Sequence, residues 1–164
     1  MKKIILIRHA KAEKGEDIDD IDRKLSEKGI VNAKLIAKIL NKKEIMFDLM
    51  ISSPARRSLE TAQIIATQIK YPKKNILIEP FLYEKFSIDT FLEYVKQLDD
   101  TFTTVVFFGH NPSITDLSHE LDYNFSEKIP KCGVVGLSMN INKWTNVETK
   151  NKKIIFFEYP KKYK

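Results

Sequence analysis

The sequence predicts an α/β protein, a three-layer α/β/α sandwich built around a mainly parallel central sheet of about six strands. The first observation is that short β-rich runs alternate along the chain with segments of helical pattern. The second is that several of these runs are apolar almost without interruption, as expected of strands covered by helices on both faces. The expected strands are Lys3–Arg8, Leu49–Ser53, Ile76–Glu79, Thr104–Gly109, Val134–Ile141 and Lys153–Tyr159.

Four segments between these strands have the pattern of helices. They are expected at about Ser26–Asn41, Pro54–Lys70, Ser87–Leu98 and Pro112–Leu121. In the first, apolar residues fall on one face at helical spacing, namely Ile30, Ala33, Ala37 and Leu40. In the second and fourth, Ser53 and Asn111 are expected to be N-caps, each followed by a proline at the first helical position. Each of these two helices then starts at the end of a strand.

The remaining segments are expected to be short connections and loops. Only Asn142–Lys152 separates the last two strands, which is too short for a helical crossover, so these strands are expected to pair antiparallel. Lys11–Lys24 is polar and acid-rich, and it is interpreted as a surface loop near the end of the first strand. Glu79–Ser87 is a second loop, and it is unusually aromatic.

Length and composition are those of one globular domain over residues 1–164, with 43% hydrophobic and 30% charged residues. The single cysteine, Cys132, excludes an internal disulfide and fits a reducing compartment. The apolar stretch Ile4–Ile7 is too short for a signal peptide, and no apolar run approaches the ~20 residues that span a bilayer. We therefore expect a cytoplasmic protein without membrane contact, and we take it to be a monomer.

The net charge of +6 does not by itself indicate a nucleic-acid partner. The lysines are scattered among 22 acidic residues, and no stripe of interleaved aromatic and basic residues is visible. Arginine is much rarer than lysine, since only four of the 28 basic residues are arginines: Arg8, Arg23, Arg56 and Arg57. The guanidinium fork suits bidentate binding of phosphate or carboxylate, so these positions are the first candidates for an anion site.

Three of the expected strands lead into side chains that bind anions. The first ends in Arg8-His9, the second is followed by Arg57, and Thr104–Gly109 runs into His110. In open α/β sheets, ligand sites form outside the carboxyl ends of the strands. If the three strands run parallel, two arginines, two histidines and two helix N-termini converge at one edge. The sequence therefore predicts an anion site, and phosphate is the anion that fits it best.

Taken singly, these residues have ordinary explanations. His9 alone is more often a core histidine bonded to a carbonyl, and Arg8 alone is explained by an aspartate of the following loop. One of Arg56 and Arg57 is expected to be a solvated helix residue, and His119 is interpreted as a surface residue without a role. The joint placement favours a site, because two of the three histidines end separate apolar strands.

Such a site has the groups that phosphoryl transfer needs. The reaction spreads negative charge over the phosphoryl oxygens, which Arg8, Arg57 and His110 can stabilise. No carboxylate cluster or Cys/His set has the spacing of a metal site, so we expect neither a metal nor a cofactor. One neutral histidine would attack phosphorus and form a phosphohistidine intermediate, from which water releases phosphate.

Glu84, in the aromatic loop, is a candidate general acid for an alkoxide leaving group. An imidazole leaving group, with a pKa of roughly 6.5 against about 16 for a hydroxyl-type group, needs such help much less. An ordinary loop carboxylate explains Glu84 equally well.

Five motifs in order resemble the histidine phosphatase superfamily, and among its members the short SixA-like phosphohistidine phosphatases. They are R-H-A-K-A, D-I-D-R-K-L-S-E-K-G, S-S-P-A-R-R-S-L-E-T-A, F-F-G-H-N-P and I-P-K-C-G-V-V-G-L. The match runs from Lys3 to about Pro160. The resemblance implies a phosphoglycerate mutase-like α/β sandwich and a metal-independent phosphatase.

Carried over to this chain, the resemblance implies that His9 is the phosphoryl-accepting nucleophile and that Arg8 binds the phosphoryl group. It also implies that Arg57 is the second phosphate-binding arginine, which leaves Arg56 as a surface neighbour. His110 matches the second active-site histidine.

Arg23 and Asn111 are candidates for the rim of the pocket. Two departures stand out: Ala10 replaces the glycine of the R-H-G form, and Lys131 follows Pro130 where many relatives have threonine. The segment between the third strand and its helix is short, which implies an open site suited to a side chain on a protein surface.

Three functions remain open. The leading one is a phosphohistidine phosphatase that acts on a phosphorylated substrate, with a phosphohistidine-bearing protein as the candidate. The second is a phosphomonoesterase for a small phosphorylated metabolite, for which Glu84 would matter. The third, of another class, is a non-catalytic phosphate-binding module.

Overall fold

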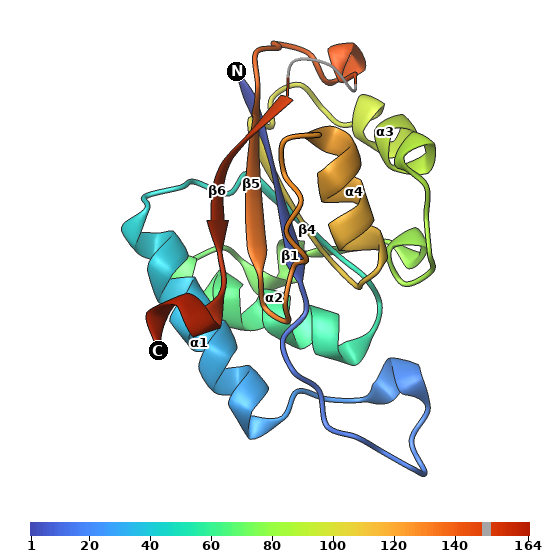
Figure 1. Cartoon of the computed structure of the whole chain (residues 1–164), viewed down its shortest axis with the longest axis vertical. Helices are drawn as coiled ribbons and strands as arrows, with labels where there is room; N and C mark the ends of the chain where they lie inside the picture. Colours follow the sequence, from blue (N-terminus) through green and yellow to red (C-terminus); the bar gives the residue numbers. More distant parts are fainter. Residues whose placement is uncertain (149–151) are drawn as a thin grey trace.

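The computed structural model describes residues 1–148 and 152–164, and it shows one six-stranded sheet with helices on both faces (Figure 1). The spatial order of the strands is β3-β2-β4-β1-β5-β6. Their bounds are β1 Lys2–Arg8, β2 Leu49–Ser52, β3 Leu77–Ile78, β4 Thr104–Gly109, β5 Val134–Met139 and β6 Lys152–Glu158. The helices are α1 Glu27–Lys42, α2 Arg56–Ile69, α3 Ile88–Lys96 and α4 Ser113–Leu121. The predicted α/β sandwich is confirmed.

Strand directions agree with the mainly parallel sheet. β4 pairs parallel with both β1 and β2, and β2 pairs parallel with β3. β5 is antiparallel to β1 and to β6, so the predicted antiparallel pairing of the last two strands is confirmed. Residues 149–151 of their predicted connection lie outside the described residues. Because β1, β2 and β4 are parallel neighbours, their carboxyl ends meet at one edge of the sheet.

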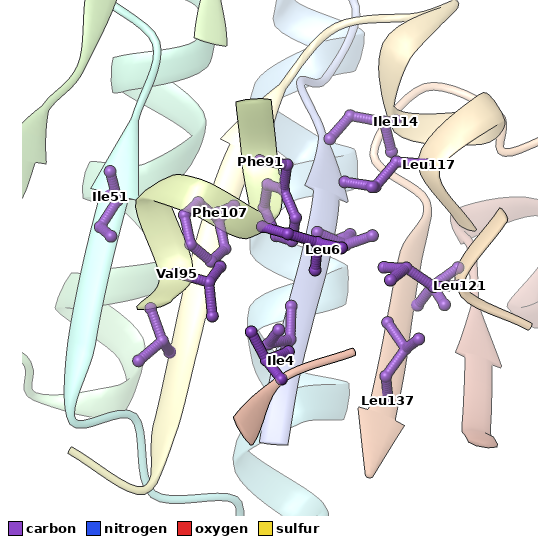
Figure 2. Packing of buried hydrophobic residues seen from close by; sticks show 14 of the residues in the cluster. Ile4, Leu6, Ile51, Phe91, Val95, Phe107, Ile114, Leu117, Leu121 and Leu137 are labelled. Carbon is purple, nitrogen blue, oxygen red and sulfur yellow. The ribbon is translucent and has the colours of Figure 1, made fainter. Parts of the chain in front are cut away.

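Alternating side chains of β1 fill a core on each face of the sheet. Ile4 and Leu6 pack with apolar residues of α3 and α4, and Figure 2 shows this layer around Phe91. Ile5 and Ile7 pack on the opposite face with α1 and α2. All four β1 side chains are at most 1% exposed, and each contributes roughly 1.5–3 kcal/mol by burial. The strand is thereby held on both faces immediately before Arg8.

The two helix starts next to strand ends differ from the prediction. α2 begins at Arg56 rather than Pro54, because the Ser53 hydroxyl accepts a hydrogen bond from the Ala55 N–H and closes a turn before the helix. α4 begins at Ser113, and a cis peptide bond precedes Pro112, which occupies the N-cap position. Neither proline is therefore the first helical residue.

Asn111 nevertheless caps α4 from one position further back. Its side-chain oxygen accepts hydrogen bonds from the Thr115 N–H at 3.2 Å and from the Thr115 hydroxyl at 2.9 Å. Smaller differences concern strand ends: β3 has two residues instead of the four expected, and β5 stops at Met139.

Both predicted loops contain a short 3₁₀-helix. One covers Asp20–Asp22 and the other Pro80–Leu82. An isolated antiparallel bridge between Ala12 and Leu25 closes the base of the first loop. Within the described part of the chain, none of the helices has the length and apolar character needed to cross a bilayer.

Candidate active site

His9 directly follows β1, and its backbone is fixed by three neighbouring segments. Its N–H donates to the Gly109 carbonyl at the end of β4, and its carbonyl accepts from the Cys132 N–H. The next N–H, of Ala10, donates to the Thr61 hydroxyl in α2. The histidine therefore sits where β4, α2 and the segment before β5 meet, which fixes its position tightly.

The imidazole of His9 is neutral, and one of its two nitrogens carries no proton. Nδ1 lies 2.7 Å from the Ala10 carbonyl, which assigns the proton to Nδ1 and leaves the lone pair on Nε2. The side chain is only 7% exposed. Burial lowers the pKa of His9 to about 3 against the opposing effect of the Ala10 bond, and the charges of His110, Arg57 and Arg8 lower it further. Nε2 therefore carries an unprotonated lone pair at neutral pH.

Arg57 lies in the first turn of α2 and joins both histidines. Its Nε donates to His9 Nε2 at 3.4 Å, and one terminal nitrogen approaches His110 Nδ1 at 3.5 Å. The same guanidinium donates to the backbone carbonyl of Asp20 at 2.7 Å and to its carboxylate at 3.0 Å. A buried guanidinium thus lies beside His9 Nε2, and its terminal nitrogens are held by Asp20.

His110 follows β4 and faces His9. The two ring centroids are 5.0 Å apart, and the rings are tilted by 52°. Nδ1 accepts from Arg57, so the proton is on Nε2, which donates to the Ser53 hydroxyl at 2.8 Å. Burial, then the charge of Arg57, lowers the pKa of His110 to about 4. His110 is therefore a neutral hydrogen-bond donor.

Arg8 is half-buried, and not all of its guanidinium nitrogens have a hydrogen-bond partner in the described part of the chain. One terminal nitrogen donates to the Ile129 carbonyl at 3.0 Å, and the Asn111 side-chain nitrogen donates to the same oxygen at 3.0 Å. Arg8 Nε is buried and has no hydrogen-bond partner among residues 1–148 and 152–164. A buried donor without a partner is costly, so the Arg8 guanidinium has hydrogen-bonding capacity that its described protein contacts do not use.

Asp20 is the site residue that sequence reasoning missed. Its carboxylate accepts from Arg57 and, at 2.7 Å, from the Tyr83 hydroxyl. The Tyr83 hydrogen bond and then Arg57 lower the pKa of Asp20, so it is ionised at neutral pH. The Tyr83 ring meets His110 edge-on at 5.6 Å. Two sequence features could have pointed to Asp20 and Tyr83: the acid-rich loop after the first strand and the aromatic character of the second loop.

The remaining candidates make no described hydrogen bond to the His9 imidazole. Glu84 is exposed, and its carboxylate makes no hydrogen bond or ion pair within the described ranges, whereas the adjacent Tyr83 reaches the site. Arg23 approaches the site through Asp20, with 3.7 Å between its Nε and the carboxylate. Asn111 bridges α4 and Ile129, and its place at the rim of the site stays a prediction. Lys131 is exposed and lies near Arg8.

The structure also bears on three single-residue interpretations. The aspartate of the loop pairs with Arg57 and not with Arg8. His119 is half-buried, and its Nε2 lies 2.7 Å from the Glu127 carbonyl, which is a structural contact. Arg56 is 54% exposed at its side chain and pairs with Glu60.

The site combines a neutral nitrogen nucleophile with two guanidinium groups and a neutral imidazole donor. This arrangement can attack phosphorus and stabilise the negative charge of a phosphoryl group. Among the described residues, no group of three or more His, Cys, Asp or Glu side chains is placed to hold a metal ion.

Comparison with known proteins agrees with this geometry. The profile described as "Histidine phosphatase superfamily (branch 1)" matches residues 4–87. The chain is 24% identical over 170 residues to an uncharacterized protein of Mycobacterium leprae. The alignment covers 94% of this chain and all of that protein.

Two solved structures have the same fold over nearly their whole length. The protein histidine phosphatase SixA, complexed with tungstate, superposes with a TM-score of 0.85 at 18% identity and covers 99% of both chains. A structure assigned as the phosphohistidine phosphatase SixA of Agrobacterium tumefaciens gives 0.79 at 23% identity, covering 97% of this chain and 98% of that one. At these identities the likeness establishes the fold.

Proposed function

Since the chain belongs to the histidine phosphatase superfamily, we propose that it is a phosphatase that acts through a phosphohistidine intermediate on His9. The observation that carries the proposal is the state of His9: Nδ1 is bonded to the Ala10 carbonyl, and Nε2 is unprotonated at 3.4 Å from Arg57 Nε. A nucleophile that is neutral at the pH of the cell and adjacent to a guanidinium is what attack on a phosphoryl group requires.

In the first step the lone pair of His9 Nε2 forms a bond to phosphorus while the bond to the leaving group breaks. Arg57 and Arg8 stabilise the phosphoryl oxygens, and His110, whose Nε2–H is held by the Ser53 hydroxyl, faces His9 across the site. The bond from His9 Nδ1–H to the Ala10 carbonyl stabilises the positive charge that phosphorylation creates on the ring. In the second step water attacks phosphorus, the N–P bond breaks, the electron pair returns to Nε2, and phosphate leaves.

We infer further that the substrate is a phosphohistidine on a protein. The support is the lack of a well-placed acid: Glu84 is exposed and makes no described contact with the site, and Asp20 is held ionised. A leaving imidazole has a pKa of roughly 6.5, so it departs with a proton from solvent, whereas an alkoxide needs a donor.

A second substrate class, a small phosphate monoester, is favoured by one observation. The Tyr83 hydroxyl lies next to Asp20, and its hydrogen bond to that carboxylate raises the pKa of Tyr83, so the hydroxyl is protonated at neutral pH. A proton-bearing group is therefore present at the mouth of the site.

Kinetics with the two substrate classes separate these possibilities. The wild-type protein should hydrolyse a phosphohistidine protein with a much higher kcat/KM than sugar or nucleotide monophosphates, and Tyr83→Phe should leave that value nearly unchanged. Preferred turnover of a monoester that collapses in Tyr83→Phe would assign the metabolite function instead. Undiminished phosphate binding by His9→Ala, combined with unchanged activity towards every substrate, would indicate a non-catalytic module.

A further inference from the structure

A groove of about 800 Å³ opens next to the phosphoryl site, and it is strongly basic. It lies between α1, the segment 128–131 that precedes β5, and the 3₁₀-helix Pro160–Tyr163 after β6, which packs beside α1 (Figure 1). Six lysines line it: Lys11, Lys28, Lys128, Lys131, Lys161 and Lys164. No side-chain carboxylate is among the lining residues, and the volume is in the range of ligand-binding pockets.

The positive charges of this groove are not neutralised. Within residues 1–148 and 152–164, none of the six lysines forms an ion pair with a carboxylate, whereas Lys43 and Lys162 outside the groove both pair with Glu158. Partial burial lowers the pKa of Lys131, and the nearby charges of Arg8 and Lys11 lower it further. Crowded, unpaired cations in a concave surface create a positive potential that concentrates anionic ligands.

The groove is continuous with the candidate active site through Arg8. This arginine lines the groove, and its bond to the Ile129 carbonyl places it against the segment that carries Pro130 and Lys131. If the phosphoryl group of a substrate contacts Arg8, the residues on one side of the phosphorylated residue lie in the groove beside the lysines. The groove also contains apolar surface from Pro130, Tyr159 and Pro160, against which side-chain stems can pack.

We propose that this groove binds an acidic segment of the phosphoprotein substrate, adjacent in that protein to the phosphorylated residue. The inference rests on the proposed function, which gives the position of the phosphoryl group. It adds that the groove recognises Asp and Glu residues that flank the phosphorylated residue of the substrate. A polypeptide fits better than a nucleic acid, because Tyr159 is the one aromatic side chain lining the groove and single-stranded nucleic acids bind to several stacked aromatics.

The test uses two matched double variants with the same change of net charge. Lys28→Glu/Lys161→Glu reverses two exposed groove lysines that are outside the phosphoryl site, and Lys73→Glu/Lys74→Glu reverses two exposed lysines next to β3 at the opposite edge of the sheet. Three substrates are compared: free phosphohistidine, a phosphohistidine peptide with acidic flanks, and the same peptide with neutral flanks.

The groove variant should lose about tenfold in kcat/KM for the acidic peptide, mainly through KM, because charges at the rim act on association. Its kinetics with free phosphohistidine and with the neutral peptide should match those of the wild type, and the control variant should match on all three. The wild-type preference for the acidic peptide should disappear in high salt. Equal losses on both peptides, or equal losses in both variants, would overturn the proposal.

Direct binding separates this proposal from the proposed function. Fluorescence anisotropy with an unphosphorylated acidic peptide requires no turnover, and we expect binding by the wild type that is about tenfold weaker in the groove variant. If the protein fails to hydrolyse phosphohistidine but this binding persists, the proposed function is wrong and the groove remains an acidic-peptide site. Binding that is unchanged in the groove variant, or tighter binding of a single-stranded oligonucleotide at the same lysines, would refute the peptide site.

Discussion

Replacing Asp20 with asparagine should tighten the binding of inorganic phosphate about fivefold. The Asp20 carboxylate occupies one edge of the Arg57 guanidinium, with 3.0 Å between the two groups. A phosphate that binds the same guanidinium must therefore come close to a second anion. Asparagine is nearly isosteric, its side-chain oxygen still accepts from Tyr83, and the backbone carbonyl of residue 20 still accepts from Arg57.

The magnitude follows from the repulsion between two anions that share one arginine. At a separation of roughly 5 Å, two unit charges repel by about 1 kcal/mol in a water-like environment. The side chain of Asp20 is 53% exposed, so solvent screening keeps the effect near this lower limit even though phosphate carries between one and two charges. About 1 kcal/mol corresponds to about a fivefold change in affinity.

Calorimetric titration with phosphate at low ionic strength measures this change. Asp19→Asn is the matched control, because Asp19 is an exposed carboxylate of the same loop and makes no described bond to Arg57. Its phosphate affinity should stay within a factor of about two of the wild type. Weaker binding by Asp20→Asn would refute the reasoning, since it would mean that the carboxylate chiefly holds Arg57 in position and competes little with phosphate.

Two further predictions concern acidity and the exposed glutamate. Burial holds the pKa of His9 at about 3 and that of His110 at about 4, both below the usual value near 6.5, so the unfolded chain binds protons that the native protein does not. The free energy of unfolding should therefore fall as the pH is lowered from about 6.5 towards 4, and urea titrations showing a constant stability there would contradict the burial of neutral imidazoles. Glu84→Gln should change kcat/KM for a phosphohistidine protein by less than about threefold, because the carboxylate is exposed and without described contacts; a loss of about a hundredfold or more would identify it as the general acid.

The convergence of Arg8, His9, Arg57 and His110 could be predicted because each lies at or shortly after the carboxyl end of a strongly apolar strand. An uninterrupted apolar run such as Ile4–Ile7 is buried on both faces, which places it in the centre of a covered sheet. Parallel strands then bring their carboxyl ends to one edge of the sheet. The order of the strands was not needed for this conclusion.

Asp20 and Tyr83 could not be predicted in the same way, because both are on loops. Their positions depend on contacts between segments 63 residues apart in sequence, which leave no local periodicity. The helix starts near Pro54 and Pro112 were placed too early for a different reason: capping signals mark a turn, and the Ala55 N–H bond to Ser53 closes one more turn before the helix begins. The basic groove likewise requires the C-terminal segment to pack beside α1.

The central claim is that His9 carries the phosphoryl group during turnover, and rapid-quench trapping with a radiolabelled phosphohistidine protein tests it most directly. We predict a label on the wild-type protein that is labile in acid and stable in base, absent in His9→Ala and retained in His119→Ala, whose histidine is outside the site. An acid-stable label, a label that persists in His9→Ala, or rapid turnover without any labelled protein would contradict a phosphohistidine intermediate on His9.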